Sequence, residues 1–354
     1  MAAPITPIDA ARLTDTMPHF NMIIDVRSPA EFADDHIPDA VNLPVLDNVQ
    51  RAEIGKLYKQ VSPFAAKRAG AVLVARNIAG HIDSRLSAMP RDWRPLVYCW
   101  RGGQRSGAMA RIFSDIGWQT SFVDGGYKAY RRHIVHLLET LPSTLRLIVL
   151  AGRTGSAKTR ILQTAQQKGL QIIDLEGIAC HRGSLLGHEP DKPQPSQRLF
   201  ESRLANALTR IDPNRPVVVE AESNKIGQIH IPPTFWARMR SASRVTIDVP
   251  LAARVAFLEQ DYAHIKTNHK SLAATLSRLR FRHSQSLVAD WEAQIKANAW
   301  TSLVKSLLES HYDPAYDRST ARRNTIELLR LKAVRLDENA IEKLAAQLAT
   351  LAHQ

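Results

Sequence analysis

The sequence predicts an α/β protein built from two consecutive domains, each with a mostly parallel sheet. Three observations predict this class. Short apolar runs alternate with helix-like segments in the first third of the chain, the alternation starts again near residue 145, and helical patterns dominate after Leu251. Strand–helix alternation is typical of parallel sheets covered by helices. The 354 residues suffice for two domains, which we place at 1–138 and 139–354.

The first domain shows three candidate strands, at residues 22–26, 96–98 and 121–123. Ser28 is expected to cap a helix after the first strand, since Pro29 and Glu31 follow in the order typical of a capped helix start. A second helix is expected over residues 107–116. The second domain repeats the pattern, with strands expected at 145–150, 170–174, 217–219, 245–249 and 333–336, and a helix at 158–168.

A cysteine loop occupies residues 98–106, where Cys99 ends a predicted strand and a glycine-bearing turn leads into a helix. Gly102 and Gly103 allow the positive φ angles that such a curl needs. Backbone N–H groups and the helix N-terminus would favour an anion at its centre, so we expect a thiolate there. Arg101 and Arg105 are candidate catalytic residues because they add positive charge to the same loop.

Two chemistries need this arrangement, and the residues leave both open. Cys99 either carries sulfur or selenium as a persulfide or perselenide, or it attacks a phosphate ester in a Cys-x5-Arg loop. The other cysteine, Cys180, has no comparable loop and is expected to be a packed apolar residue.

A phosphate-binding loop is predicted at residues 152–159, between a strand and a helix, as a Walker A motif requires. Backbone N–H groups would hold phosphates, Lys158 would reach a terminal phosphate, and Thr159 is placed to ligate Mg²⁺. Ala157 replaces the usual glycine before the lysine, so we expect weakened binding of ordinary nucleotides. The candidate ligand-binding residues of the loop are Gly152, Thr154, Gly155, Ser156, Lys158 and Thr159.

An acidic partner for this loop is expected at the end of a strand. Glu220 and Glu222 follow the predicted strand 217–219, and Asp174 and Glu176 follow an earlier one. The sequence does not choose among these four. No dedicated set of metal ligands is predicted.

The charge predicts a polyanionic partner. Lysine and arginine number 47 against 34 acidic residues, a net charge of +13, and the excess is concentrated late in the chain. Charge alone leaves RNA, DNA and a membrane surface open. The absence of an uninterrupted apolar run of about 18 residues argues against a membrane span, and two cysteines without a secretory signal favour the reducing cytoplasm. The late basic residues include Arg278, Arg280, Arg282, Arg318, Arg322, Arg323, Arg330, Lys332 and Arg335.

Two segments resemble the signature motifs of rhodanese domains. Residues 23–46 resemble the N-terminal motif, and residues 124–127, Asp-Gly-Gly-Tyr, resemble the motif that ends the domain. The resemblance implies that Asp25, Arg27 and Glu31 support the loop and that His36 is structural. Five residues separate Cys99 from Arg105, whereas a simple rhodanese has four, and the wider ring resembles loops that hold a phosphate.

A rhodanese domain followed by a phosphate-binding loop resembles the tRNA 2-selenouridine synthase family. The resemblance covers nearly the whole chain and is carried by residues 99–103, 174–177, 181–184, 195–201, 220–223 and 311–316. It implies a transferase that prenylates 2-thiouridine at the tRNA wobble position with geranyl diphosphate and then replaces the S-geranyl group with selenium from selenophosphate. In this scheme residues 152–159 hold the diphosphate and Cys99 delivers selenium.

Rival interpretations stay open. The chain could be a P-loop kinase or ATPase with a regulatory rhodanese domain, a cysteine sulfurtransferase or phosphatase, or a non-catalytic RNA-binding protein. The segment that begins at His311 is expected either to contact tRNA or the prenyl chain, or to end a helix at Pro314.

Overall fold

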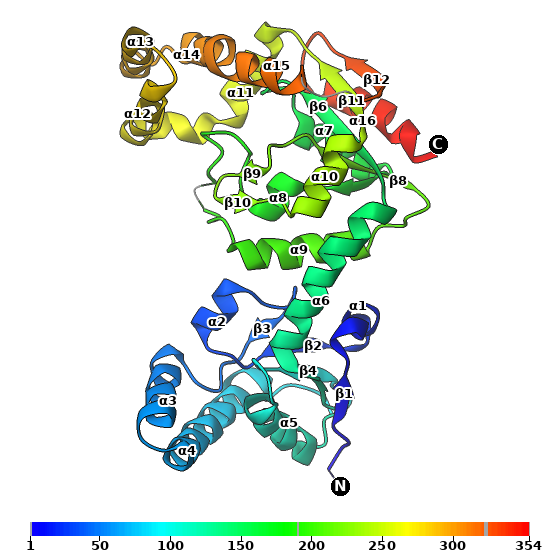
Figure 1. Cartoon of the computed structure of the whole chain (residues 1–354), viewed down its shortest axis with the longest axis vertical. Helices are drawn as coiled ribbons and strands as arrows, with labels where there is room; N and C mark the ends of the chain where they lie inside the picture. Colours follow the sequence, from blue (N-terminus) through cyan, green and yellow to red (C-terminus); the bar gives the residue numbers. More distant parts are fainter. Residues whose placement is uncertain (1, 190, 322–324, 354) are drawn as a thin grey trace. The chain divides into compact units, whose positions relative to one another are not determined.

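The computed structural model describes residues 2–189, 191–321 and 325–353. The chain forms two compact units. Unit 1 comprises Met1–Thr140 and Pro195–Thr209, and unit 2 comprises Leu141–Gln194 and Arg210–Gln354. Figure 1 follows the helices and strands of each unit along the chain. The predicted α/β class with parallel sheets, and the helical part after Leu251, are confirmed.

Unit 1 is built on a five-stranded parallel sheet with the order β1-β5-β4-β2-β3. Parallel pairing brings the carboxyl ends of all strands to one edge, and the cysteine loop begins there, directly after β4. The bounds are β1 (Thr6–Ile8), β2 (Met22–Asp25), β3 (Val41–Asn42), β4 (Pro95–Tyr98) and β5 (Ser121–Val123).

Helices surround this sheet, and fully buried side chains such as Ile24, Val97 and Phe113 form its core. Helix α2 starts as the sequence predicts, because Ser28 and Glu31 form a reciprocal capping box with Pro29 in the first turn. The helices are α1 (Leu13–Thr16), α2 (Pro29–Asp34), α3 (Asn48–Gln60), α4 (Pro63–His81), α5 (Gln104–Ile116), α6 (Gly126–Thr140) and α9 (Gln197–Thr209).

Unit 2 contains a second five-stranded parallel sheet, in the order β12-β11-β6-β8-β7. The central strand β6 leads into the phosphate loop, and its neighbour β8 ends at Glu220. The bounds are β6 (Arg146–Gly152), β7 (Gln171–Ile173), β8 (Pro216–Glu220), β11 (Ser243–Asp248) and β12 (Glu327–Lys332); β9 (Lys225–Ile226) and β10 (Ile229–His230) form a separate antiparallel pair.

Two hydrophobic clusters hold several helices of unit 2 in place. One packs α7 and α16 with the sheet, and the other joins α12, α13 and α14 around the fully buried Trp291 (Figure 1). The bounds are α7 (Lys158–Gln167), α8 (Leu175–Ala179), α10 (Pro233–Ser241), α11 (Leu251–Asp261), α12 (His269–Ser277), α13 (Gln285–Lys296), α14 (Trp300–Leu307), α15 (Asp313–Thr320) and α16 (Glu338–Ala349).

The last strand lies earlier than the sequence predicts. The expected strand at 333–336 is wrong, because β12 spans Glu327–Lys332 and pairs with β11. Leu329 and Leu331 face the core at alternate positions of β12, which is the period of a strand. Val334 is 84% exposed and therefore contributes nothing to burial.

No helix in the described part of the chain has the length and apolar character that crossing a bilayer requires.

Candidate active sites: a cysteine loop and a phosphate loop

The thiol of Cys99 lies inside the cysteine loop. The residue is 2% exposed, and the hydroxyl of Ser106, in the first turn of α5, donates to its Sγ at 3.3 Å. The thiol contacts the carbonyl of Arg101 at 3.7 Å. Gly102 and Gly103 have φ angles of 71° and 68°, which confirms that the turn needs left-handed backbone. The sulfur is thus held between a curled loop and a helix N-terminus.

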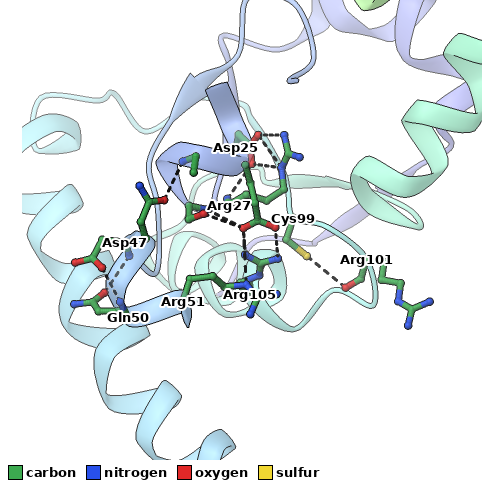
Figure 2. A network of polar contacts seen from close by, with 12 residues as sticks. Asp25, Arg27, Asp47, Gln50, Arg51, Cys99, Arg101 and Arg105 are labelled. Atoms are coloured by element: carbon green, nitrogen blue, oxygen red, sulfur yellow. Dashed lines mark hydrogen bonds and ion pairs between the residues drawn. The ribbon is translucent and has the colours of Figure 1, made fainter. Parts of the chain in front are cut away.

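The two arginines of this loop are placed differently. Arg105 donates from both terminal nitrogens to Glu31, at 2.9 and 3.4 Å. Burial would by itself raise the pKa of Glu31, but the hydrogen bonds and charge of Arg105 outweigh it and lower that pKa below its ordinary value. Figure 2 shows the side chain of Arg101 directed away from Cys99, and this residue is exposed. Of the two arginines, only Arg105 lies beside a carboxylate of the described residues, that of Glu31, which partly neutralises its charge. The sequence did not predict this ion pair.

A buried ion pair supports the base of the loop. Arg27 is 1% exposed and donates to both carboxylate oxygens of Asp25, and its Nη2 also donates to the carbonyl of Asp35 at 2.6 Å. Its guanidinium lies 4.0 Å from the centre of the Tyr127 ring. The Asp25 and Arg27 side chains thus hold β2 and α6 together rather than facing the thiol.

The closing glycine Gly126 lies against the backbone of the cysteine loop. A Cβ at this position would be 2.5 Å from the carbonyl oxygen of Cys99, and φ is +60°. The next two amides, of Tyr127 and Lys128, donate to the carbonyls of Cys99 and Trp100 at 2.8 and 3.0 Å. Only glycine leaves room for this approach. The Asp-Gly-Gly-Tyr motif indicated the end of a rhodanese domain, but it did not predict that Gly126 packs against the Cys99 carbonyl.

The phosphate loop connects β6 to α7. Lys158 donates to the carbonyl of Gly152 at 3.0 Å, and the Thr159 hydroxyl donates to Glu176 at 2.7 Å. Gly155 has a φ of 82°. Ala157 adopts a φ of 57°, a conformation that costs a residue with a Cβ about 1 kcal/mol, and it is buried in the core cluster.

Carboxylates gather beside the phosphate loop at the ends of β7 and β8. Glu220 is fully buried and accepts from the amide of Glu176 at 2.8 Å. Burial, and then the charges of Asp174 and Glu176, raise the pKa of Glu220 well above its ordinary value. Burial and the nearby Glu176 raise the pKa of Glu222 to about 8, although Lys158 opposes this shift. Of the four carboxylates that the sequence left open, Glu176 is the one that contacts Thr159.

Among the described residues, no group of three or more histidine, cysteine or acidic side chains is placed to hold a metal ion. An ion at the phosphate loop would therefore depend on Thr159, on one carboxylate and on the oxygens of a bound phosphate compound.

A cavity of about 880 Å³ opens in front of the phosphate loop. Its wall combines the loop with acidic and basic side chains and with three tyrosines, so it suits a charged ligand. Cys180, which the sequence predicted to be packed, is partly exposed and lines this cavity. Further lining residues are Glu176, Arg182, Glu222, Tyr262, Tyr312 and Tyr316.

Helix α15 is tied to the phosphate loop by two ion pairs. Arg254 is 2% exposed, donates to both oxygens of Asp313 and also donates to the carbonyl of Thr154 at 3.1 Å. Arg153 pairs with Asp317 at 3.0 Å. The expectation that a helix ends at Pro314 is wrong, because this proline lies in the first turn of α15, where its missing N–H costs nothing.

The late basic region includes one prominent aromatic side chain. Phe281 is 97% exposed and lies between Arg280 and Arg282 at the turn that joins α12 to α13. Arg280 donates to Glu292 at 3.1 Å. The predicted basic residues Arg322 and Arg323 lie outside the described residues.

Two family models match this chain, one in its N-terminal part and one in its C-terminal part. Residues 145–346 match the family model described as the tRNA 2-selenouridine synthase AAA domain, and residues 9–133 match the rhodanese-like domain. The chain belongs to the tRNA 2-selenouridine synthase family. The resemblance stated from the sequence is thereby confirmed, and the chain is an enzyme of this type.

Curated relatives support the assignment to the tRNA 2-selenouridine synthase family. The tRNA 2-selenouridine synthase of Alcanivorax borkumensis is 35% identical over 85% of this chain and 90% of its own length. That of Bdellovibrio bacteriovorus is 33% identical over 87% of this chain and 91% of its own. The match to the Nitrosomonas europaea protein, at 35% identity, covers 68% of this chain and 63% of that protein.

Proposed function

We propose that this enzyme converts wobble 2-thiouridine in tRNA to 2-selenouridine through an S-geranyl intermediate, with geranyl diphosphate and selenophosphate as co-substrates. The observation that carries the proposal is the presence, in one member of this family, of two strand–loop–helix segments whose geometry suits an anion. Each loop follows a parallel strand and precedes a helix, one with a buried thiol and one with a lysine.

In the first step the phosphate loop holds the diphosphate. The sulfur of 2-thiouridine attacks C1 of the geranyl group, the C1–O bond breaks, and diphosphate leaves with the bonding electrons while the base loses its N3 proton. Lys158 exchanges its bond to the Gly152 carbonyl for a diphosphate oxygen, and backbone N–H groups of the loop bind the others. Thr159 and Glu176 offer the oxygen ligands that Mg²⁺ prefers, and the ion would offset the charge of the leaving diphosphate.

In the second step the cysteine loop holds selenophosphate. Selenium attacks C2 of the base, the geranyl thiolate leaves, and water hydrolyses the Se–P bond to give phosphate and 2-selenouridine. We assign Cys99 to contact the selenium atom and Arg105 to bind the phosphoryl oxygens. The side chain of Arg101 is directed away from Cys99, so it would join Arg105 only after turning towards the bound phosphoryl group. Arg105 is oriented for this role by Glu31, while Ser106 orients the sulfur.

The tRNA is proposed to bind the basic helical part of unit 2, in the reducing cytoplasm. The net charge of +13 supports a polyanionic substrate. Such binding weakens steeply with salt, because lysine and arginine release counterions from the phosphates.

The test is mass spectrometry of wobble nucleosides after incubation of thiolated tRNA with the purified protein. Geranyl diphosphate alone should give S-geranyl-2-thiouridine, and addition of selenophosphate should give 2-selenouridine. The rival ATPase interpretation predicts instead a saturable ATP turnover that is lost in Lys158→Ala, and that result would overturn the proposal.

A further inference from the structure

A second, smaller cavity lies in the helical part of unit 2 and is lined mainly by apolar side chains. Its volume is about 80 Å³. Helices α11, α12 and α14 contribute most of the wall, together with the short helical turns Ala263–Thr267 and Leu308–Tyr312. The apolar residues of this wall include Leu258, Ile265, Leu272, Trp300, Leu303 and Val304.

This apolar cavity adjoins the phosphate loop. Thr154, Tyr262 and Tyr312 line both the small cavity and the large one in front of the loop. Leu258 also lines both, and it lies so close to the loop that a Cβ on Gly155 would be 2.8 Å from its Cδ1. One ligand can therefore place an anionic head on the loop and an apolar tail among the helices.

The chemistry of the wall decides what kind of tail fits. A nucleotide would bring a base and a ribose, whose polar atoms need partners that a mainly apolar wall does not supply. The carboxylate of Glu259, one of the charged groups on this wall, already accepts from Thr301 at 2.6 Å. A hydrocarbon chain needs no partners and gains about 0.8 kcal/mol for each buried CH₂ group.

The size of the cavity points the same way. A volume of 80 Å³ corresponds to about six water-sized positions, which suits the outer five-carbon unit of a geranyl chain whose inner unit lies where the two cavities meet. We propose that this pocket binds the geranyl chain of the diphosphate substrate, and that Val304 and Leu303 on α14 set the accepted chain length. The inference rests on the proposed function, since it takes the head group to be a diphosphate on the phosphate loop.

The residues chosen for a test line the small cavity only. Val304 is half-buried and lies outside the wall of the large cavity, so a larger side chain there narrows the apolar pocket without touching the loop. Val334 is 84% exposed and lies in neither wall, which makes Val334→Phe the matched control for Val304→Phe.

The experiment measures prenyl transfer to thiolated tRNA from geranyl, dimethylallyl and farnesyl diphosphate, and in parallel the binding of inorganic pyrophosphate. Val304→Phe should raise KM for geranyl diphosphate at least about tenfold and shift preference towards the shorter dimethylallyl chain. Pyrophosphate affinity should not change, and Val334→Phe should behave as wild type. The opposite change, Leu303→Ala, should improve the use of the longer farnesyl chain.

The outcomes separate the inference from the function on which it rests. If wild type transfers geranyl groups but Val304→Phe and Leu303→Ala keep its chain-length preference, the pocket assignment is wrong. If wild type transfers no prenyl group at all, the proposed function fails first. A loss of pyrophosphate binding in Val304→Phe would indicate a folding defect in that variant. In that case the use of farnesyl diphosphate by Leu303→Ala decides: improved use supports the pocket assignment, and unchanged use contradicts it.

Discussion

The cysteine loop and the phosphate loop have the same strand–loop–helix plan but use their glycines differently. A Cβ on Gly102 or Gly103 would meet no atom within 4 Å, so these residues are needed for their positive φ angles alone. A Cβ on Gly152 would lie 2.5 Å from Ser156 Oγ, and one on Gly155 2.8 Å from Leu258. The first loop is open around its glycines, whereas the second is packed against the rest of its unit.

The two loops also differ in how firmly their cationic side chains are held. Arg105 is held by two hydrogen bonds to Glu31, a carboxylate on another helix. Lys158 is held by one hydrogen bond to a carbonyl of its own loop, and an anionic ligand oxygen would be a stronger acceptor for its ammonium than this neutral carbonyl. In the proposed function, the cysteine loop would therefore bind its ligand with an arginine already held in place, whereas Lys158 of the phosphate loop would exchange a bond within its own loop for a bond to the ligand.

The largest effect is expected from Cys99→Ser. If the thiol holds the selenium of selenophosphate in position, selenation of an S-geranyl anticodon stem–loop should fall by about a thousandfold, because correct placement of a reactant contributes that much to a rate. Geranylation should continue, so S-geranyl tRNA should accumulate. Normal selenation by this variant, measured by nucleoside mass spectrometry, would remove Cys99 from the mechanism. Cys180→Ser serves as the control.

Lys158→Ala should produce the converse pattern. Removal of one charged donor from the leaving group should lower the rate of geranylation by about a hundredfold, while tRNA that already carries the S-geranyl group is selenated at the wild-type rate. Single-turnover assays with each substrate measure the two rates. Equal losses in both assays would show that the loops do not divide the steps.

Gly126→Ala should destabilise unit 1 more than Gly102→Ala. The first substitution places a Cβ against the Cys99 carbonyl in addition to its positive φ, and should cost about 3 kcal/mol. The second meets open space and should cost about 1 kcal/mol for backbone conformation alone. Urea denaturation measures the free energy of unfolding of the two variants. Equal losses would contradict the expected difference between a crowded and an open glycine position.

Phe281→Ala should weaken tRNA binding about tenfold, since an exposed aromatic ring between arginines is placed to stack on a base. Both modification steps should weaken together, because both need the tRNA. Filter binding across a salt series measures the effect. Phe64→Ala, at a side chain 73% exposed in unit 1, is the matched control and should bind as wild type.

The smallest effect concerns pH. The pKa of Glu222 is raised to about 8, so the folded state holds a proton that the unfolded state releases above the ordinary value of 4.5. Stability should therefore fall as pH rises from 4.5 to 8. Glu222→Gln should reduce the fall in Tm between pH 6 and pH 8 by about 5 °C. Glu309→Gln, at an exposed carboxylate, should leave the wild-type profile unchanged.

The parts of the fold that follow from local sequence were predictable. The alternation of strands and helices, the cap at Ser28 and the curl at Gly102 and Gly103 depend on residues a few positions apart, and each is confirmed. The strand expected at 333–336 failed because Val334 and Leu336 have the same two-residue spacing as Leu329 and Leu331, so the sequence pattern fits both segments. Only the pairing with β11, a long-range contact, places the strand at Glu327–Lys332.

The contacts that shape the sites join residues far apart in the chain. Glu31 and Arg105 are 74 positions apart, and Arg254 and Asp313 are 59 apart, so no local pattern pairs them. The apolar cavity is likewise assembled from three helices and two turns. The sequence singled out the segment that contains Asp313 and Pro314. Its connection to the phosphate loop through Arg254 could be seen only in the tertiary structure.

One sequential assay tests the division of labour between the two loops most directly. Thiolated tRNA is treated with the Cys99→Ser protein and geranyl diphosphate, purified, and passed to the Lys158→Ala protein with selenophosphate only. We expect S-geranyl-2-thiouridine after the first stage and 2-selenouridine after the second. Unmodified tRNA after the first stage, or S-geranyl tRNA that the second protein leaves unchanged, would contradict it.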